Sequence, residues 1–304
     1  MTSTVGYIQN LQENHLPLMS QLWPGTFNNQ NVTRSILFEK TFGAFDYAPE
    51  LCFGYFDDDG LAGFICGTPA TRPGRAGIRL LIVAPARRRR GIGTMLLSEF
   101  ENRLRAQGSI SHIRAVATPG NYLTPGVNPF DMDFTCFLEV HNYHWVGTSQ
   151  NLLAESTFQR RYQDRLESIL KSGYTLRRAD SNDDRLLEFV KEQFPSWLHE
   201  VRRSLLNSPV TIHVCEAGGE AVGFACSESN NVGSGVLGPT GVHPAHRGHG
   251  ISQVTLHLCV DDLRCRGFER YILGWTNPDL NCFFRREFGA ERSGVYWIYE
   301  KAIA

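Results

Sequence analysis

Residues 83–119 read VAPARRRRGIGTMLLSEFENRLRAQGSISHIRAVATP, and residues 242–278 read VHPAHRGHGISQVTLHLCVDDLRCRGFERYILGWTNP. The two stretches align without a gap at an offset of 159 residues, so that Val83 meets Val242 and Gly91 meets Gly250. Upstream, the pair Gly63-Phe64 repeats as Gly223-Phe224 at an offset of 160. Glycine, proline and arginine matches over such a length predict that one domain-sized fold is used twice.

Each copy lies within the same succession of patterns. A short strand, a segment of helical pattern and two strands around a tight turn precede it, and the turns are residues 57–60 (DDDG) and 217–220 (AGGE). An apolar strand, a glycine loop, a helix and a further strand follow. This order predicts the α+β class, with a mixed sheet whose central strand leads into the glycine loop.

The segment between the copies sets the expected domain boundaries. Residues 151–172 (NLLAESTFQRRYQDRLESILKS) are mostly polar with apolar residues at roughly helical spacing, and Ser172-Gly173 is a helix-stop signal. We therefore expect an N-terminal domain at residues 1–150, a linker helix at 151–172 and a C-terminal domain at 173–304.

Composition argues against several classes of protein. The chain has 304 residues, and its 30 Lys and Arg balance 31 Asp and Glu, whereas nucleic-acid and anionic-membrane binders carry a basic surplus. Its apolar runs are shorter than the ~20 residues that span a bilayer, and no signal peptide is read at the N-terminus. The eight cysteines form no CxxC pair and no zinc-spaced cluster. We expect a cytoplasmic protein with reduced thiols, no metal and neither nucleic acid nor membrane as partner.

The glycine loops carry the candidate chemistry. Residues 87–93 (RRRRGIG) and 247–252 (RGHGIS) each follow a strand and open a helix. The first N–H groups of a helix lack partners and lie at its positive end, and glycine allows an anion to approach the backbone closely. Such a loop can hold a pyrophosphate. A Walker A loop is excluded because no Lys-Ser/Thr follows, and a Rossmann loop because Leu96 and Thr255 replace the third glycine.

At these residues the chain resembles motif A of the GNAT superfamily of acetyl-CoA-dependent N-acetyltransferases, which reads strand-Val-x-Pro and then Arg/Gln-x-x-Gly-x-Gly/Ala. The resemblance covers nearly the whole chain and implies two tandem GNAT domains with acetyl-CoA as co-substrate. The implied cofactor contacts in the first half are Val83, Arg88, Arg89, Arg90, Gly91, Ile92, Gly93 and Thr94. Those in the second half are Val242, Arg247, Gly248, His249, Gly250, Ile251, Ser252 and Asn277. Some tandem members acetylate aminosugars, and mycothiol synthase is another.

The catalytic residues are harder to place, because the tyrosine that serves as acid in the family is Phe284 in one half and Leu138 in the other. Tyr296 and Tyr299 lie three residues apart on the last expected strand, so they face opposite sides, and Tyr296 is our candidate acid. Asp279 and Glu287 are candidate bases, although each also reads as an ordinary surface carboxylate. The second half is expected to be catalytic, because Thr118 and Asn142 replace the family's asparagine and glycine in the first.

Three functions remain open from the sequence. The first is acetylation of a primary amine on a small molecule such as an aminosugar. The second is acetylation of a peptide or protein, and the third is a tandem GNAT protein that binds CoA without catalysis. The sequence leaves the amine acceptor and the oligomeric state open.

Overall fold

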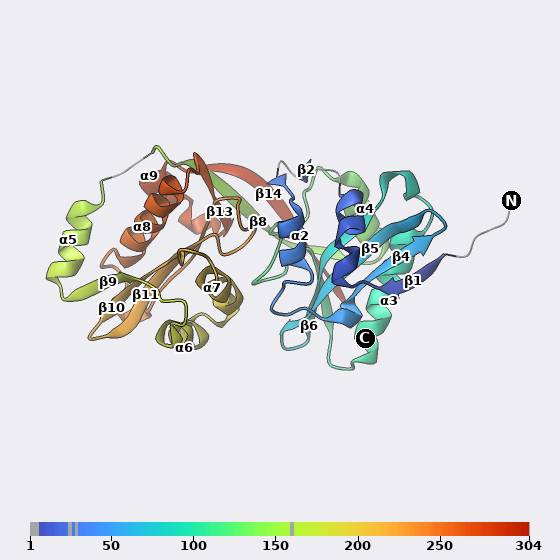
Figure 1. Ribbon diagram of the computed structural model, residues 1–304, viewed down its shortest axis with the longest axis horizontal. Helices are drawn as coiled ribbons and strands as arrows, with labels where there is room; N and C mark the ends of the chain where they lie inside the picture. Colours follow the sequence, from blue (N-terminus) through green and yellow to red (C-terminus); the bar gives the residue numbers. More distant parts are fainter. Residues whose placement is uncertain (1–5, 24–25, 28–29, 159–160, 304) are drawn as a thin grey trace. The chain divides into compact units, whose positions relative to one another are not determined.

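The computed structural model describes residues 6–23, 26–27, 30–158 and 161–303 (Figure 1). The chain divides into two compact units. Unit 1 consists of Met1–Thr148 together with Tyr296–Ala304, and unit 2 is Ser149–Val295. Each unit is an α+β domain built on a mixed sheet, which confirms the predicted fold class.

The strands of unit 1 lie in the order β1-β4-β5-β6-β7-β14, and only β6 and β7 run parallel. They are β1 (Tyr7–Asn10), β4 (Cys52–Asp57), β5 (Gly60–Arg72), β6 (Arg75–Val83), β7 (His112–Ala115) and the end of β14 (Glu291–Ala302). A small separate sheet pairs β2 (Thr26–Phe27) antiparallel with β3 (Gln30–Asn31).

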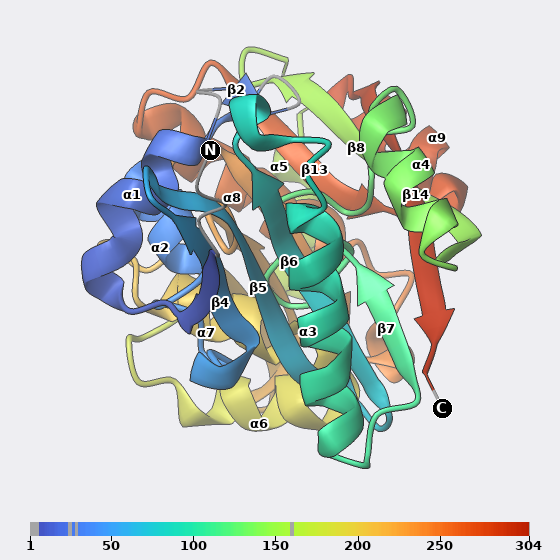
Figure 2. The ribbon, with the colours of Figure 1, turned by 90° about the vertical axis from the view of Figure 1, so that its right-hand side faces the viewer.

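Helices cover both faces of the unit 1 sheet. One face packs against α1 (Leu16–Leu22) and α2 (Arg34–Lys40), and the other against α3 (Ile92–Ala106) and α4 (Met132–Val140). Helix α3 forms because Leu96, Leu97, Phe100 and Leu104 make one apolar stripe, which is fully buried against the sheet. Figure 2 shows α3 lying across this sheet, with β14 beside β7 at its edge.

Unit 2 repeats the arrangement, with its strands in the order β8-β13-β12-β11-β10-β9. They are β8 (His144–Glu155), β9 (Tyr174–Arg178), β10 (Ile212–Ala217), β11 (Glu220–Ser227), β12 (Val236–Val242) and β13 (Arg270–Thr276). Helices α6 (Asp184–Gln193) and α7 (Leu198–Leu205) cover one face. The other face carries α5 (Gln163–Lys171), α8 (Ile251–Cys265) and α9 (Asn281–Phe288).

The last strand of each sequence half belongs to the sheet of the other half. Strand β8 continues to Glu155 and pairs with β13, while β14 pairs with β7 through Tyr299–Ala302. The expected linker helix is therefore wrong over residues 151–155, and the helix that follows occupies only Gln163–Lys171. Leu152 and Ala154 are buried at alternate positions, which is the period of a strand. The expected C-terminal domain at 173–304 likewise loses its final strand to unit 1.

All eight cysteines are free thiols, and five of them are buried. In the part of the chain that the structure describes, no helix is long and apolar enough to cross a membrane.

Candidate functional site

The two glycine loops have the same local geometry. Gly91 and Gly250 are the N-cap residues of α3 and α8, with φ of +81° and +86°. Arg88 Nε donates to the Val83 carbonyl at 3.3 Å, and Arg247 Nε donates to the Val242 carbonyl at 3.2 Å. Glycine is needed at the two N-caps because other residues adopt a left-handed conformation only with strain. Both loops therefore present the free N–H groups of a helix start, as the sequence predicted.

The strand before each loop separates from its parallel neighbour. Pairing of β6 with β7 ends at Ile78↔Ala115, and pairing of β12 with β13 ends at Leu237↔Leu273. The His243 N–H donates to the Val222 carbonyl, so by antiparallel alternation the peptide groups of Thr240 and Val242 face away from β11. They point to the edge of β12 along which β13 no longer pairs.

The same alternation in unit 1 places Val83 on the open edge of β6, since the Ala84 N–H donates to the Ala62 carbonyl on β5. An open strand edge can pair with the amides of an extended ligand. Val83 and Val242, expected to contact such a ligand, thus lie where a ligand could reach their peptide groups.

The two units differ at the point where the pairing register of this strand shifts, which we call the irregular point of the strand. The register of β6 slips next to Arg79, and that of β12 slips next to Gly238, which occupies the same position at the offset of 159. The Arg79 side chain is only 1% exposed and donates to both carboxylate oxygens of Asp46 at 2.8 and 2.7 Å. Beside Gly238, by contrast, a methyl group would meet no atom within 4 Å. A buried side chain occupies this point in unit 1, whereas unit 2 has no side chain there and a Cβ would meet none.

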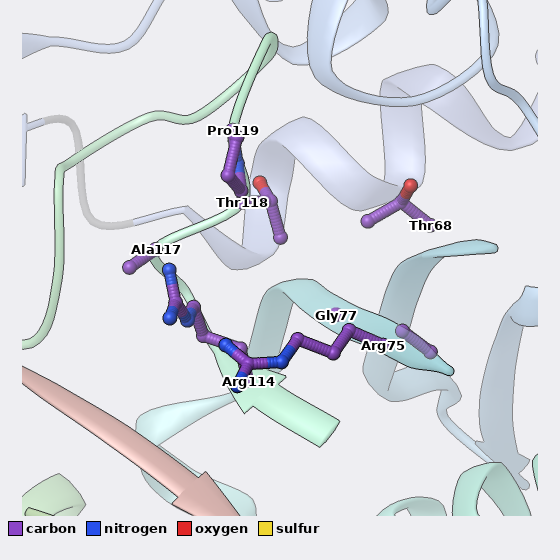
Figure 3. Close-up of a pocket in the computed structure, with 8 residues that line it drawn as sticks. Thr68, Arg75, Gly77, Arg114, Ala117, Thr118 and Pro119 are labelled. Atoms are coloured by element: carbon purple, nitrogen blue, oxygen red, sulfur yellow. The ribbon is translucent and has the colours of Figure 1, made fainter. Parts of the chain in front are cut away.

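A buried polar network fills the surroundings of Arg79 on the α1/α2 face of unit 1. Lys40 donates to Glu39 at 2.6 Å and to Asn121 at 2.8 Å, and Thr68 donates to Asp46 at 2.6 Å. A small cavity remains, and Figure 3 shows Arg75 and Arg114 side by side in its wall. Its lining consists of Thr68, Arg75, Ala76, Gly77, Arg114, Ala117, Thr118 and Pro119. Both arginines bond to the single carboxylate of Glu300, which can compensate one of their two charges.

The structure places the expected catalytic residues on different elements. Asn277 and Asp279 are exposed, and the Asn277 side chain accepts the Asp279 N–H at 3.1 Å. Glu287 is 2% exposed and accepts from Gln253 at 2.5 Å and from Arg286 at 2.8 Å. Because Gln253 lies in the first turn of α8, Glu287 joins α9 to the start of the loop helix. A carboxylate held in this way is poorly placed to act as a general base.

Tyr296, expected as the acid of the second half, lies in unit 1 instead. Its Cβ is 3.0 Å from the position that a Cβ on Gly126 would take, and the next residue, Trp297, bridges to Val127. Tyr299 is buried in the same unit, where burial and its bond to Glu139 raise its pKa to about 12. Tyr296 is the first residue of the β14 segment that belongs to unit 1, and its role as the acid of the second half stays a prediction.

Asn142 is less disruptive in the first half than its sequence suggested. It follows α4 with φ of +62°, and Gly289 follows α9 with φ of +64°. Asparagine is the residue other than glycine that most readily takes this left-handed position after a helix. Each helix is therefore followed by a residue in the left-handed conformation, directly after α9 and one residue later after α4.

Sequence reasoning missed Arg165, which lies on α5 against Gly250 in the second loop. No signal could have found it, because α5 lies outside the repeated stretch and its contact with the loop is tertiary.

Comparison with known proteins agrees with this geometry. The model of the acetyltransferase (GNAT) family matches residues 16–122 and 172–290, so the chain belongs to that family in both halves. No curated protein matches the sequence. Among solved structures, a GCN5-related glucosamine N-acetyltransferase region of a fungal multi-domain GH3 β-N-acetylglucosaminidase is similar, with a TM-score of 0.80 at 16% identity. That match covers 99% of this chain, which spans 38% of the fungal one.

Two further structures resemble the whole chain. A GCN5-related N-acetyltransferase from Sphaerobacter thermophilus gives a TM-score of 0.70 at 16% identity and covers 98% of this chain and 95% of its own. A tandem GNAT protein from the clavulanic acid biosynthesis pathway gives 0.64 at 15% identity and covers 98% of both. At these identities the matches establish the shared tandem fold.

Proposed function

We propose that the protein transfers the acetyl group of acetyl-CoA to a primary amine of a small molecule, and that unit 2 carries out the transfer. The observation that carries this choice is the contrast between Gly238, which is open, and Arg79, which is buried in an ion pair at the same point of the strand. An acceptor amine needs space beside the irregular point of the strand. In unit 1 that space holds the protein's own side chains.

The residues of unit 2 fit the proposed co-substrate. The N-cap Gly250 and the first turn of α8 suit the diphosphate of CoA, because their N–H groups are free and lie at the positive helix end. The outward peptide groups of Thr240 and Val242 suit the two amides of the pantetheine arm. Acetyl-CoA supplies the thioester whose acetyl group is transferred.

The chemistry requires a neutral amine and a donor for developing negative charge. The amine nitrogen forms a bond to the acetyl carbon and gives up a proton, the carbon–sulfur bond breaks, and the thiolate takes up a proton. Negative charge develops on the carbonyl oxygen, and a fixed backbone N–H can stabilise it. Since Pro239 has no N–H, the outward N–H of Thr240 is the first available beyond the irregular point. The rate should rise with pH towards the pKa of the amine.

The acceptor class is the finer part of the proposal. The fold likeness to a region named a glucosamine N-acetyltransferase makes an aminosugar the first acceptor to test. Peptide acetylation remains an outcome of the same experiment.

The experiment measures thiol release from acetyl-CoA with glucosamine, a simple aliphatic amine and a peptide, using Gly250→Ala and Gly91→Ala as a matched pair. Both glycines have nearly the same positive φ, so the backbone strain added by alanine is similar, but a Cβ on Gly250 would also lie 2.4 Å from Arg165 Cδ, whereas one on Gly91 meets no atom within 4 Å. We expect Gly250→Ala to lower kcat/KM for glucosamine by about tenfold or more, because the new methyl group strains the second loop and displaces the arginine beside it. Gly91→Ala should leave turnover nearly intact.

The reverse result, with Gly91→Ala inactive and Gly250→Ala active, would show that unit 1 is the enzyme. Turnover with the peptide but with neither glucosamine nor the aliphatic amine would show that the acceptor is a peptide or protein amine. Calorimetric CoA binding without turnover for any amine would refute catalysis and favour a CoA-binding protein.

A further inference from the structure

The two loops differ in the charge that they carry themselves. In the first loop Arg87 pairs with Asp57 and Asp59, and Arg88 bonds to the Val83 carbonyl. Arg89 and Arg90 follow, and both are exposed. In the second loop Arg247 takes the role of Arg88, but Gly248 and His249 stand where Arg89 and Arg90 stand in the first. The second loop therefore lacks two guanidinium groups.

An arginine from outside the loop lies at this position. A Cβ placed on Gly250 would be 2.4 Å from Arg165 Cδ and 3.0 Å from Arg165 Nε, so the arginine side chain rests against the glycine. The equivalent position beside Gly91 is open, with no atom within 4 Å. Gly250 thus has a second reason to be glycine besides its φ, since any side chain would displace Arg165.

The helix that carries Arg165 is held firmly to α8. Tyr162, at the start of α5, stacks on His257 with ring centroids 4.8 Å apart and donates to Asp261 at 2.6 Å. Ile169 is buried with Ile251 and Val254 of α8 in one apolar cluster. Contacts at both ends of α5 fix the place from which Arg165 extends. Among the residues that the structure describes, Arg165 forms no ion pair.

We propose that Arg165 binds the diphosphate of CoA at the second loop and supplies from the linker helix the charge that Gly248 and His249 do not. This inference rests on the proposed function. Guanidinium groups suit phosphate oxygens because their N–H donors form a planar fork. A charge-assisted hydrogen bond of this kind contributes about 1.5–3 kcal/mol, which corresponds to roughly 10- to 100-fold in affinity.

Calorimetry of CoA binding tests the proposal in a background with Arg89→Ala and Arg90→Ala, which weakens the first loop. We expect Arg165→Gln to weaken CoA affinity by about tenfold or more, and Arg165→Lys to lose less because it keeps the charge. Lys171→Gln removes a charge from the far end of α5 and is the matched control, with no expected change. Because Arg165 is exposed, none of these variants should alter the thermal melting temperature.

The probes separate the phosphates of CoA. Dephospho-CoA keeps the diphosphate and should lose the same factor on Arg165→Gln, whereas a loss confined to CoA would overturn the diphosphate assignment. Unchanged affinity would also refute the proposal, and tighter binding would show that Arg165 obstructs the loop. A background protein that binds no CoA at all would refute the proposed function together with this inference, whereas binding that is indifferent to Arg165 would refute the inference alone.

Discussion

Replacing Tyr299 with alanine should destabilise unit 1, although Tyr299 lies five residues before the last residue, in the second sequence half. Its side chain is 0% exposed and packs with α3 and α4, and its hydroxyl donates to Glu139 at 2.8 Å. Truncating a buried aromatic side chain costs about 3–5 kcal/mol. Against a typical domain stability of about 5–15 kcal/mol, this loss is large.

Hydrogen exchange measured by mass spectrometry locates the loss. A cost of about 4 kcal/mol lowers the protection of amides that exchange through unfolding of unit 1 by about a thousandfold. We expect this in peptides from α3, while peptides from α8 keep their protection.

The matched control is Leu152→Ala on β8. Leu152 is 3% exposed in the core of unit 2, although it lies in the first half of the chain. It should lower protection in α8 by about 2–5 kcal/mol and spare α3. The exchange of strands would be refuted if Tyr299→Ala affected α8 and Leu152→Ala affected α3.

Two further predictions concern buried charge. Burial raises the pKa of Asp262, but hydrogen bonds from His213 and Arg178 outweigh it and hold the pKa at about 2, below the usual 3.8. This difference corresponds to about 2 kcal/mol of stability, which is present above pH 4 and is lost as the pH falls towards 2. Chemical denaturation should therefore show that the free energy of unfolding falls less between pH 6 and pH 2.5 in Asp262→Asn than in the unsubstituted protein. In unit 1, Asp46→Ala should lower the free energy of unfolding in urea by about 3–5 kcal/mol, because it leaves Arg79 buried without its carboxylate. Adding Arg79→Met should restore most of the lost stability. No recovery in the double variant would contradict the ion-pair explanation.

The repeat and the loops could be predicted from sequence because their determinants are local. A glycine at a helix start and an arginine three residues before it fix a backbone geometry that needs no distant partner, and the structure gives Gly91 and Gly250 nearly the same φ. The exchange of β8 and β14 could not be predicted in this way. Leu152 pairs with Leu273 and Ala154 with Tyr271, and the choice of sheet depends on this tertiary pairing.

The unit to which some site residues belong depends on the same tertiary pairing. If each half formed its own sheet, Tyr296 would belong to the second half, but the exchange of strands places it in unit 1. Arg79 lies four residues before the stretch that aligns with the second half, and an arginine in a strand normally indicates a solvated edge. Only its ion pair with Asp46, from a segment 33 residues earlier, shows that Arg79 fills the sheet face.

The two halves have therefore kept different parts of one site. Arg89 holds φ of +62°, where Gly248 of the second loop holds +83° without strain. A non-glycine residue in the left-handed region costs about 1 kcal/mol or more, so the backbone conformation at this position disfavours an arginine. Its charge is the simplest reason for keeping it. Under the proposed function, a first loop that still favours anions, joined to a sheet face closed around Arg79, would suit a unit that binds CoA without reacting, with the chemistry in the unit that has Gly238.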